Sequence, residues 1–87
     1  MLEQKITVTN PSGLHMRPAG IFVKEVGRFK SDVMIHFNGN EYNAKSMLNL
    51  LSAAIKCGDE IELKINGEDE EECMKTVVAA IESGLGE

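Results

Sequence analysis

The sequence lacks several features that mark common classes of protein. It has no cluster of lysine and arginine, and its nine basic residues stand against 14 acidic ones, for a formal net charge of −5. This charge argues against a nucleic-acid partner, because binding to a phosphate backbone needs clustered basic side chains. No apolar run approaches the length of a membrane span, and the first residues do not resemble a signal peptide. We therefore expect no membrane partner and a cytoplasmic location.

Cysteine is also scarce. Cys57 and Cys73 are separated by 15 residues, and no histidine or further cysteine stands at metal-ligand spacing from either of them. We predict no metal site and no cofactor. Without a secretion signal the two thiols are expected to be reduced, with Cys73 in or near a helix core.

What is present is the composition of an ordinary globular chain. Hydrophobic residues make up 43% and charged residues 26% of the 87 residues, and there is no repeat or low-complexity segment. This length is near the lower limit at which one hydrophobic core stands without disulfides or metals. We expect a single domain over residues 1–87.

Hydrophobic periodicity predicts the secondary structure. Alternating apolar and polar residues are typical of strands with one buried face, and they occur at 2–9, 32–37, 41–44 and 59–65. Apolar residues at helical spacing begin at Pro18, at Met47 and, in the helix that is predicted to follow Asp69, at Met74. Asn38-Gly39 predicts a hairpin turn, because a type I′ turn needs positive φ at both central residues.

The predicted helix ends are marked by capping residues. Ser46 is predicted to be the N-cap of a short helix whose buried stripe includes Ile55, and Gly58 to end that helix. Asp69, with Glu72 three residues later, forms a capping-box pattern for the last helix. The order is strand, helix, strand, strand, helix, strand, helix. We predict an α+β fold of two layers, an open-faced β-sandwich with three helices on one face of an antiparallel sheet.

The segment from Ser12 to Ala19 is the candidate site. Pro18 has no N–H and is well placed at the first position of a helix, which would put His15 and Arg17 at the helix N-terminus. Free amides and the helix dipole favour an anion there. A neutral imidazole is a nucleophile that can accept and release a phosphoryl group, which would meet Arg17, the first amides and the Ser12 hydroxyl. The alternative is that His15 makes an ordinary hydrogen bond and Arg17 is a surface charge.

A second feature is Leu48, which falls beside the apolar stripe of the helix that follows Ser46. A large apolar residue near a helix N-terminus, with Lys45 at its rim, is typical of a docking surface. It is equally consistent with packing at the edge of the core. His36 falls on the face of its strand opposite the apolar one, where we expect a solvated or cross-strand role.

Two motifs resemble one family. Gly13-Leu14-His15-Met16-Arg17-Pro18-Ala19 resembles the active-site signature of HPr, the histidine-containing phosphocarrier of the bacterial sugar phosphotransferase system. Lys45-Ser46-Met47-Leu48 is similar to the regulatory-serine segment of HPr from Gram-positive-type bacteria, and the likeness runs the length of the chain. The resemblance implies a four-stranded sheet with strand order 1-4-2-3.

The resemblance also implies a carrier that is not itself an enzyme. Phosphorylated enzyme I would place a phosphoryl group on Nδ1 of His15, and the group would pass to the IIA domain of a sugar permease. Ser46 would be phosphorylated by HPr kinase/phosphorylase and link the carrier, through a catabolite-control transcriptional regulator, to catabolite repression. The predicted phosphate-binding residues are Ser12, Met16 and Arg17, and the predicted docking residues are Gly20, Lys24, Lys45, Met47, Leu48 and Leu51. We expect a monomer.

Met16 departs from the family pattern, which usually has a small residue there. A related regulatory subfamily carries glutamine in place of the active histidine, whereas this chain has His15. Three hypotheses remain: a phosphoryl carrier acting through His15, a regulatory binding module modified only at Ser46, and a small sandwich domain without phosphate chemistry.

Overall fold

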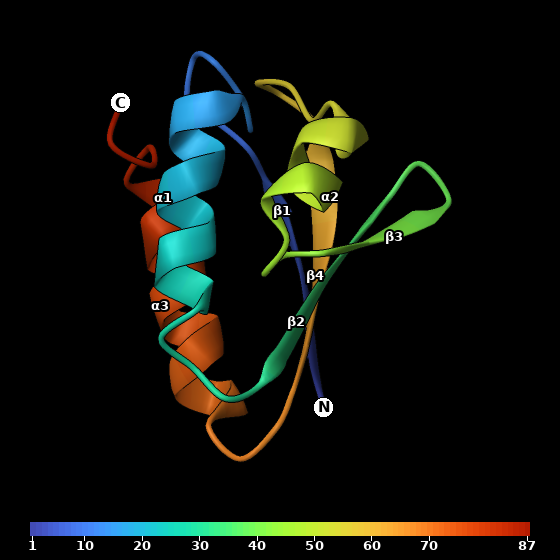
Figure 1. Ribbon diagram of the computed structural model, residues 1–87, viewed down its shortest axis with the longest axis vertical. Helices are drawn as coiled ribbons and strands as arrows, with labels where there is room; N and C mark the ends of the chain where they lie inside the picture. The colour runs from blue at the N-terminus through green and yellow to red at the C-terminus, as the bar shows by residue number, and fades with distance from the viewer.

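The computed structural model describes all 87 residues and contains three helices and one four-stranded antiparallel sheet (Figure 1). The elements in chain order are β1 (Leu2–Thr7), α1 (Met16–Val26), β2 (Asp32–Phe37), β3 (Asn40–Asn43), α2 (Met47–Ala53), β4 (Glu60–Asn66) and α3 (Glu70–Glu82). The strand order is β1-β4-β2-β3. This confirms the predicted α+β sandwich and the sheet order that the resemblance implied.

The alternation in β4 places one side of the sheet in the core. Ile61, Leu63 and Ile65 are almost fully buried, while the residues between them are only partly so. On the other side of the sheet, His36 lies across from Glu62, with its Nδ1 3.8 Å from Oε1 of the carboxylate. His36 therefore has the cross-strand role expected from its position.

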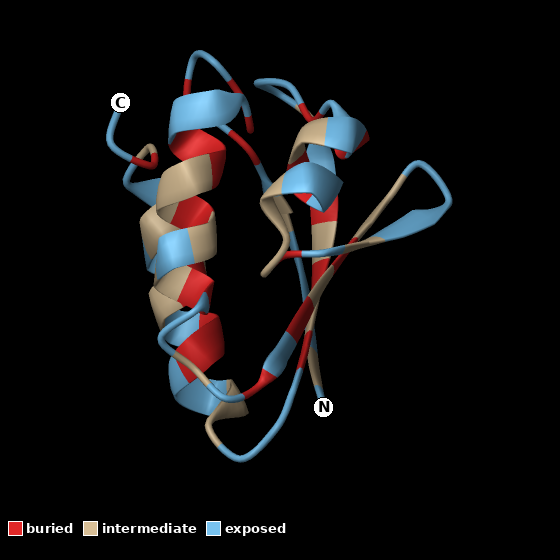
Figure 2. Cartoon of the chain, in the orientation of Figure 1, coloured by how far each residue is buried: buried red, intermediate tan, exposed pale blue.

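The helices cover the apolar side of the sheet. Figure 1 shows α1 and α3 side by side, with α2 set apart near the beginning of α1. Figure 2 shows the buried residues gathered between the helices and the sheet. The buried stripe of α1 includes Phe22 and Val26, and that of α3 includes Cys73, Val77 and Ile81. Both stripes follow the predicted helical spacing.

Strand β2 turns into β3 as predicted. Asn38 has φ 53° and Gly39 has φ 79°, so both central residues of the turn have the positive φ that Asn-Gly accommodates most readily. The turn joins strands whose residues pair from Phe37 with Asn40 to Met34 with Asn43. The hairpin leaves β3 as an edge strand of four residues.

Two predicted helix bounds are wrong. Helix α1 begins at Met16, two residues before Pro18, with His15 as its N-cap. Pro18 is tolerated there because the amides of a first turn have no intrahelical acceptor. Helix α2 ends at Ala53, well before Gly58, because Ala54 takes the left-handed conformation with φ 54°. Ile55 is buried, as predicted, but outside the helix.

The predicted capping box of α3 is also wrong. Asp69 precedes the helix, but its side chain makes no capping bond. Its carboxylate instead accepts hydrogen bonds from the amides of Lys30 and Ser31, at 2.9 and 3.0 Å, and from the Ser31 hydroxyl. Donors from the segment just before β2 therefore take the place of the amides of the first turn of α3. These bonds, chiefly that from the Ser31 hydroxyl, lower the pKa of Asp69.

None of the three helices has the combination of length and apolar character that a membrane crossing requires.

Candidate functional site

His15 lies at the junction of a loop and α1. As the N-cap residue it has an extended backbone, and its carbonyl accepts the first helical bond, from the amide of Ala19 at 2.8 Å. Its side chain makes no capping bond to the helix amides, and the ring is exposed. The imidazole is therefore open to a molecule arriving from solvent.

The first turn of α1 presents donors beside this ring. The amides of Met16 and Arg17 precede the first intrahelical hydrogen bond, so the helix provides no acceptor for them. No acidic residue occupies this turn, and Arg17 is exposed. An anion at His15 would meet two amides, the positive end of the helix dipole and one guanidinium.

The loop before His15 is fixed on the segment that follows α2. The amide of Leu14 donates to the carbonyl of Ile55 at 2.9 Å. Gly13 has φ +63°, and a Cβ built on it would lie 2.6 Å from that carbonyl oxygen and 2.7 Å from Cα of Lys56. Only glycine fits a backbone approach this close in this conformation. The loop that carries His15 is thus positioned by backbone packing.

Ser12 is bonded to a residue that the sequence patterns did not single out. Its hydroxyl donates to Oε2 of Glu87 at 2.7 Å, and its amide donates to Oε1 at 3.0 Å. Buried Asn10 donates from Nδ2 to the same Oε1 at 3.0 Å and to the carbonyl of Gly13 at 2.7 Å. These bonds, that from Asn10 first, hold the pKa of Glu87 below its usual range, with a smaller contribution from the charge of Arg17.

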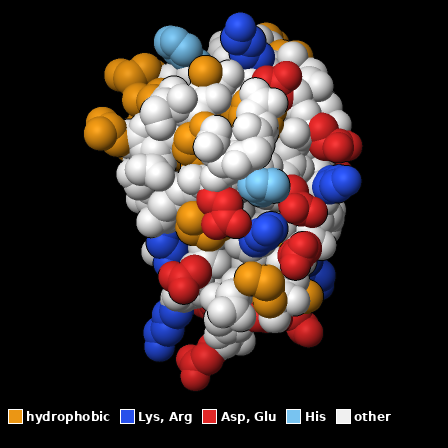
Figure 3. All heavy atoms as spheres, turned by 90° about the vertical axis from the view of Figure 1, so that its right-hand side faces the viewer, with side chains coloured by type: hydrophobic (Ala, Val, Ile, Leu, Met, Phe, Trp, Pro, Cys, Tyr) orange, Lys and Arg blue, Asp and Glu red, His pale blue; other side chains and the backbone are white.

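An open hollow of about 460 Å³ brings part of the predicted site together. Its lining includes Ser12, His15, Met16 and, from α2, Leu51. Met16, which lines the hollow, is 61% exposed, and Leu48 of α2 is 79% exposed, unusually high values for large apolar side chains. Figure 3 shows hydrophobic side chains protruding beside a histidine at the upper end of the molecule.

The remaining predicted docking residues are more dispersed. Gly20 lies opposite Met47, whose Cε would be 3.9 Å from an added Cβ. Lys24 is exposed in the last turn of α1, away from His15. Lys45 is half-buried, and its Nζ donates to the carbonyl of Phe29 at 2.8 Å, so it ties down the chain that follows α1.

Ser46 is the N-cap of α2, as predicted. Its Oγ accepts a hydrogen bond from the amide of Asn49 at 3.3 Å, and Nδ2 of Asn49 lies 3.2 Å from the same oxygen. It does not line the hollow beside His15. The two residues proposed for phosphorylation therefore belong to separate helix N-termini.

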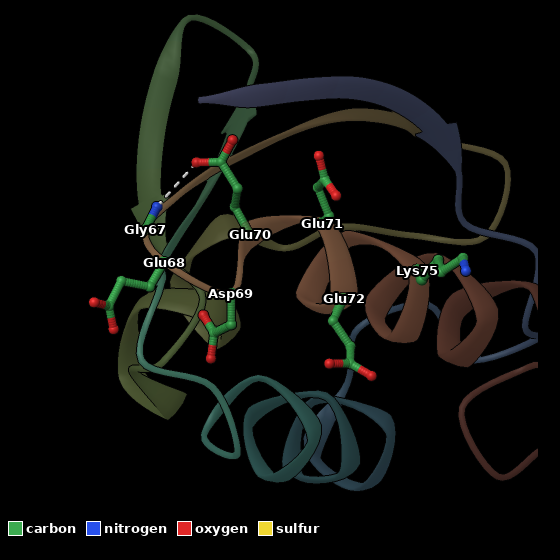
Figure 4. A pocket seen from close by; sticks show the side chains of 7 residues that line it. All are labelled: Gly67, Glu68, Asp69, Glu70, Glu71, Glu72 and Lys75. Carbon is green, nitrogen blue, oxygen red and sulfur yellow. Dashed lines mark hydrogen bonds between the residues drawn. The ribbon is translucent and has the colours of Figure 1, made fainter.

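A larger hollow, of about 770 Å³, lies at the opposite end of the molecule from the beginning of α1, and no hydrophobic residue lines it (Figure 1). Figure 4 shows its carboxylates, from Glu68 to Glu72, around the beginning of α3, with Lys75 farther along the helix. The Glu70 carboxylate accepts from the Gly67 amide at 3.1 Å. These side chains do not form a group that could hold a metal ion.

The described features define a small α+β sandwich with an exposed histidine and a guanidinium at the N-terminus of its first helix. A sequence model described as "PTS HPr component phosphorylation site" matches residues 2–83. The chain belongs to the HPr family of the phosphotransferase system. Membership supports a phosphocarrier role in that system, since phosphocarrier proteins HPr are among the relatives of the chain.

Both sequence relatives and solved structures support this assignment. The chain is 42% identical over 82 residues to HPr-like protein Crh of Bacillus subtilis, covering 94% of this chain and 96% of Crh. It is 40% identical over 83 residues to phosphocarrier protein HPr of Mycoplasma pneumoniae, covering 94% of each. HPr of Thermoanaerobacter tengcongensis, at 38% identity, superposes with a TM-score of 0.96 over 100% of this chain and 98% of the other. A dimer of that same protein gives 0.80 over the full length of both chains.

Proposed function

We propose that this chain is a phosphocarrier that accepts a phosphoryl group on Nδ1 of His15. The carbonyl of His15 accepts the first hydrogen bond of α1, whereas its exposed side chain makes no capping bond. This free imidazole is the observation that carries the proposal. In the transfer, the N–P bond to Nδ1 forms as the bond between the phosphoryl group and its donor breaks, and Nε2 keeps its proton.

The surroundings of His15 suit a group that must be both accepted and released. The amides of Met16 and Arg17 and the Arg17 guanidinium are placed to offset the phosphoryl charge. The site is a shallow surface and not an enclosed cage, so the group stays accessible to the next acceptor. Because so few groups hold the phosphoryl group, the transfer stays reversible.

The proposed donor and acceptors are enzyme I and the IIA domains of sugar permeases. The partner surface we propose consists of the docking residues predicted from the sequence: Gly20, Lys24, Lys45, Met47, Leu48 and Leu51. Exposed Met16 supplies apolar area beside His15, and exposed Leu48 supplies it on α2. A modest patch of this kind is typical of brief encounters. Because both phosphoryl donors of the family, phosphoenolpyruvate and ATP, are cytoplasmic metabolites, we propose a cytoplasmic location.

We also propose that Ser46 is a regulatory phosphorylation site for HPr kinase/phosphorylase. At the N-cap of α2 the added charge would be tolerated by the helix dipole. Its effect would then fall on acidic partners approaching the α2 surface and not on the fold. A catabolite-control transcriptional regulator is the further partner proposed for the form phosphorylated on Ser46.

The alternative function is a regulatory module modified only at Ser46. The observation that favours it is the similarity to Crh, which a solved structure describes as the catabolite repression HPr of Bacillus subtilis. The presence of His15 favours the carrier, since the family resemblance implies glutamine at this position in the regulatory subfamily. The two functions predict different labelled residues.

Incubation with enzyme I and labelled phosphoenolpyruvate separates them. A carrier takes up acid-labile label that is lost in His15→Ala and retained in His36→Ala, the matched control at the only other histidine. Label that appears only with ATP and the kinase, is acid-stable and disappears in Ser46→Ala would establish the regulatory module instead. A chain that takes no label in either assay is neither.

We propose a monomer as the working form, because a carrier must present the same face to a donor and an acceptor in turn. Solved structures of relatives include dimers of HPr and of Crh. Light scattering of the purified chain across a concentration series decides the question, and a constant mass of a dimer would refute the monomer.

A further inference from the structure

Glu87 occupies the polar groups of the loop that leads to His15. One carboxylate accepts three hydrogen bonds: from the Ser12 hydroxyl at 2.7 Å, the Ser12 amide at 3.0 Å and Nδ2 of Asn10 at 3.0 Å. Ser12 and Asn10 lie 75 and 77 residues before Glu87 in the sequence. Glu87 thus acts as an internal anion bound by the loop.

The backbone holds this carboxylate in place. After α3, the amide of Leu85 donates to the carbonyl of Ala80 at 3.1 Å, and the amide of Glu87 donates to that of Gly84 at 2.9 Å. Leu85 is only 1% exposed although its φ is 49°, so its burial fixes a left-handed turn. Figure 1 shows the end of the chain at the same end of the molecule as the beginning of α1.

Ser12 also lines the hollow that contains His15. Its hydroxyl has a single proton, which is donated to Glu87 here and is the same proton that the hydroxyl would donate to a phosphoryl oxygen. The positive charge of Arg17 also contributes to lowering the pKa of Glu87. A phosphoryl group on His15 would therefore compete with the carboxylate for the Ser12 proton and for the Arg17 charge, and the two anions would repel each other.

We propose that Glu87 is a positioning residue that holds the Ser12 hydroxyl while His15 is unmodified and is displaced from it when His15 carries a phosphoryl group. This inference rests on the proposed function. Because the displacement costs free energy, Glu87 weakens the hold of the site on the phosphoryl group. The carrier then gives the group up more readily to its acceptor.

Glu87→Gln tests the proposal with little change in shape. The amide carbonyl still accepts from the Ser12 amide and from Asn10, but the charge is gone and the Ser12 proton is free to reach a phosphoryl oxygen. Glu68→Gln is the matched control, since it removes the same charge from a side chain with no hydrogen bond in the hollow of Figure 4. Thermal melting verifies that both variants fold.

The readout is the equilibrium ratio of phosphorylated to free carrier, measured by ³¹P NMR at a fixed ratio of phosphoenolpyruvate to pyruvate with catalytic enzyme I. Releasing one charge-assisted hydrogen bond predicts that Glu87→Gln raises this ratio about three- to tenfold. In a Ser12→Ala background the contested proton is absent and only the effect of the charge remains, so the same change should raise the ratio by a clearly smaller factor.

Each remaining outcome is decisive. If wild-type protein takes no label, the proposed function fails and this inference fails with it. If wild type is phosphorylated but Glu87→Gln matches Glu68→Gln, or if its ratio falls, only the role of Glu87 is wrong. An increase of equal size in the Ser12→Ala background would likewise refute displacement from the Ser12 hydroxyl.

Discussion

Replacement of Gly13 by alanine tests whether backbone packing positions the loop that carries His15. The residue has φ +63°, and its missing Cβ would lie 2.6 Å from the carbonyl oxygen of Ile55. The atoms nearest to this position all belong to the backbone of Ile55 and Lys56, which cannot move aside as a flexible side chain could. The loop or the segment after α2 must therefore move to admit a methyl group.

The expected loss of stability has two parts. The left-handed conformation costs a residue with a Cβ about 1–2 kcal/mol, and forcing a methyl group into a packed site costs about 1–3 kcal/mol. Gly13→Ala should thus lower the free energy of unfolding by about 2–5 kcal/mol. In a chain of this size that corresponds to a fall in the melting temperature of roughly 10–40 °C.

Gly39→Ala is the matched control. Gly39 also has positive φ, +79°, but nothing lies within 4 Å of the position of its Cβ. Gly39→Ala should therefore lower the free energy of unfolding only by the cost of the left-handed conformation, about 1–2 kcal/mol. Urea unfolding followed by circular dichroism measures both variants. Losses that agree within about 0.5 kcal/mol would refute the close packing of Gly13 on the segment after α2.

Further changes test the two helix N-termini and the cysteines. Ser46→Ala should lower the free energy of unfolding by about 1 kcal/mol because the N-cap is lost, whereas Ser46→Asp keeps a capping oxygen and should stay within about 0.5 kcal/mol of wild type. A large loss of stability of the aspartate variant in urea unfolding would contradict the proposal that a phosphate on Ser46 leaves the fold intact. Because the pKa of Asp69 is lowered in the folded state, its contribution is present above its ordinary pKa, about 4, and is lost as the pH falls through the lower folded value. Melting temperatures between about pH 6 and 2 should therefore fall more steeply for wild type than for Asp69→Asn, and parallel curves would show that the carboxylate contributes nothing. Burial raises the pKa of the Cys73 thiol. Iodoacetamide at neutral pH should therefore label exposed Cys57 and reach Cys73 only after unfolding, as measured by mass spectrometry. Equal labelling of the two cysteines in the native protein would contradict this prediction.

The parts of the fold that were predicted correctly are those with a local signal. The alternation of Ile61, Leu63 and Ile65 and the Asn38-Gly39 turn each depend on neighbouring residues only, and both agree with the structure. The position of His15 and Arg17 at a helix N-terminus was also predicted from one short segment.

The errors arose where a distant residue competes with a local one. Asp69 looks like the cap of α3, but its acceptors are filled by donors 38 and 39 residues away. Ala54 ends α2 in a conformation that alanine rarely adopts, so no sequence signal marks the end. The contact between Ser12 and Glu87 joins two segments that have no periodic pattern, and only the folded chain brings them together.

The place of β1 in the sheet has a consequence for biosynthesis. Its sole neighbour in the sheet is β4, where Leu2 pairs with Ile65 and Ile6 with Ile61. Strand β1 therefore has no partner until β4 has been synthesised. The ribosome makes β1 first and β4 long afterwards, whereas the β2–β3 hairpin can close at once. A nascent chain therefore carries an unpaired, partly apolar segment through most of its synthesis, and the sheet is completed late, by the joining of segments made far apart in time.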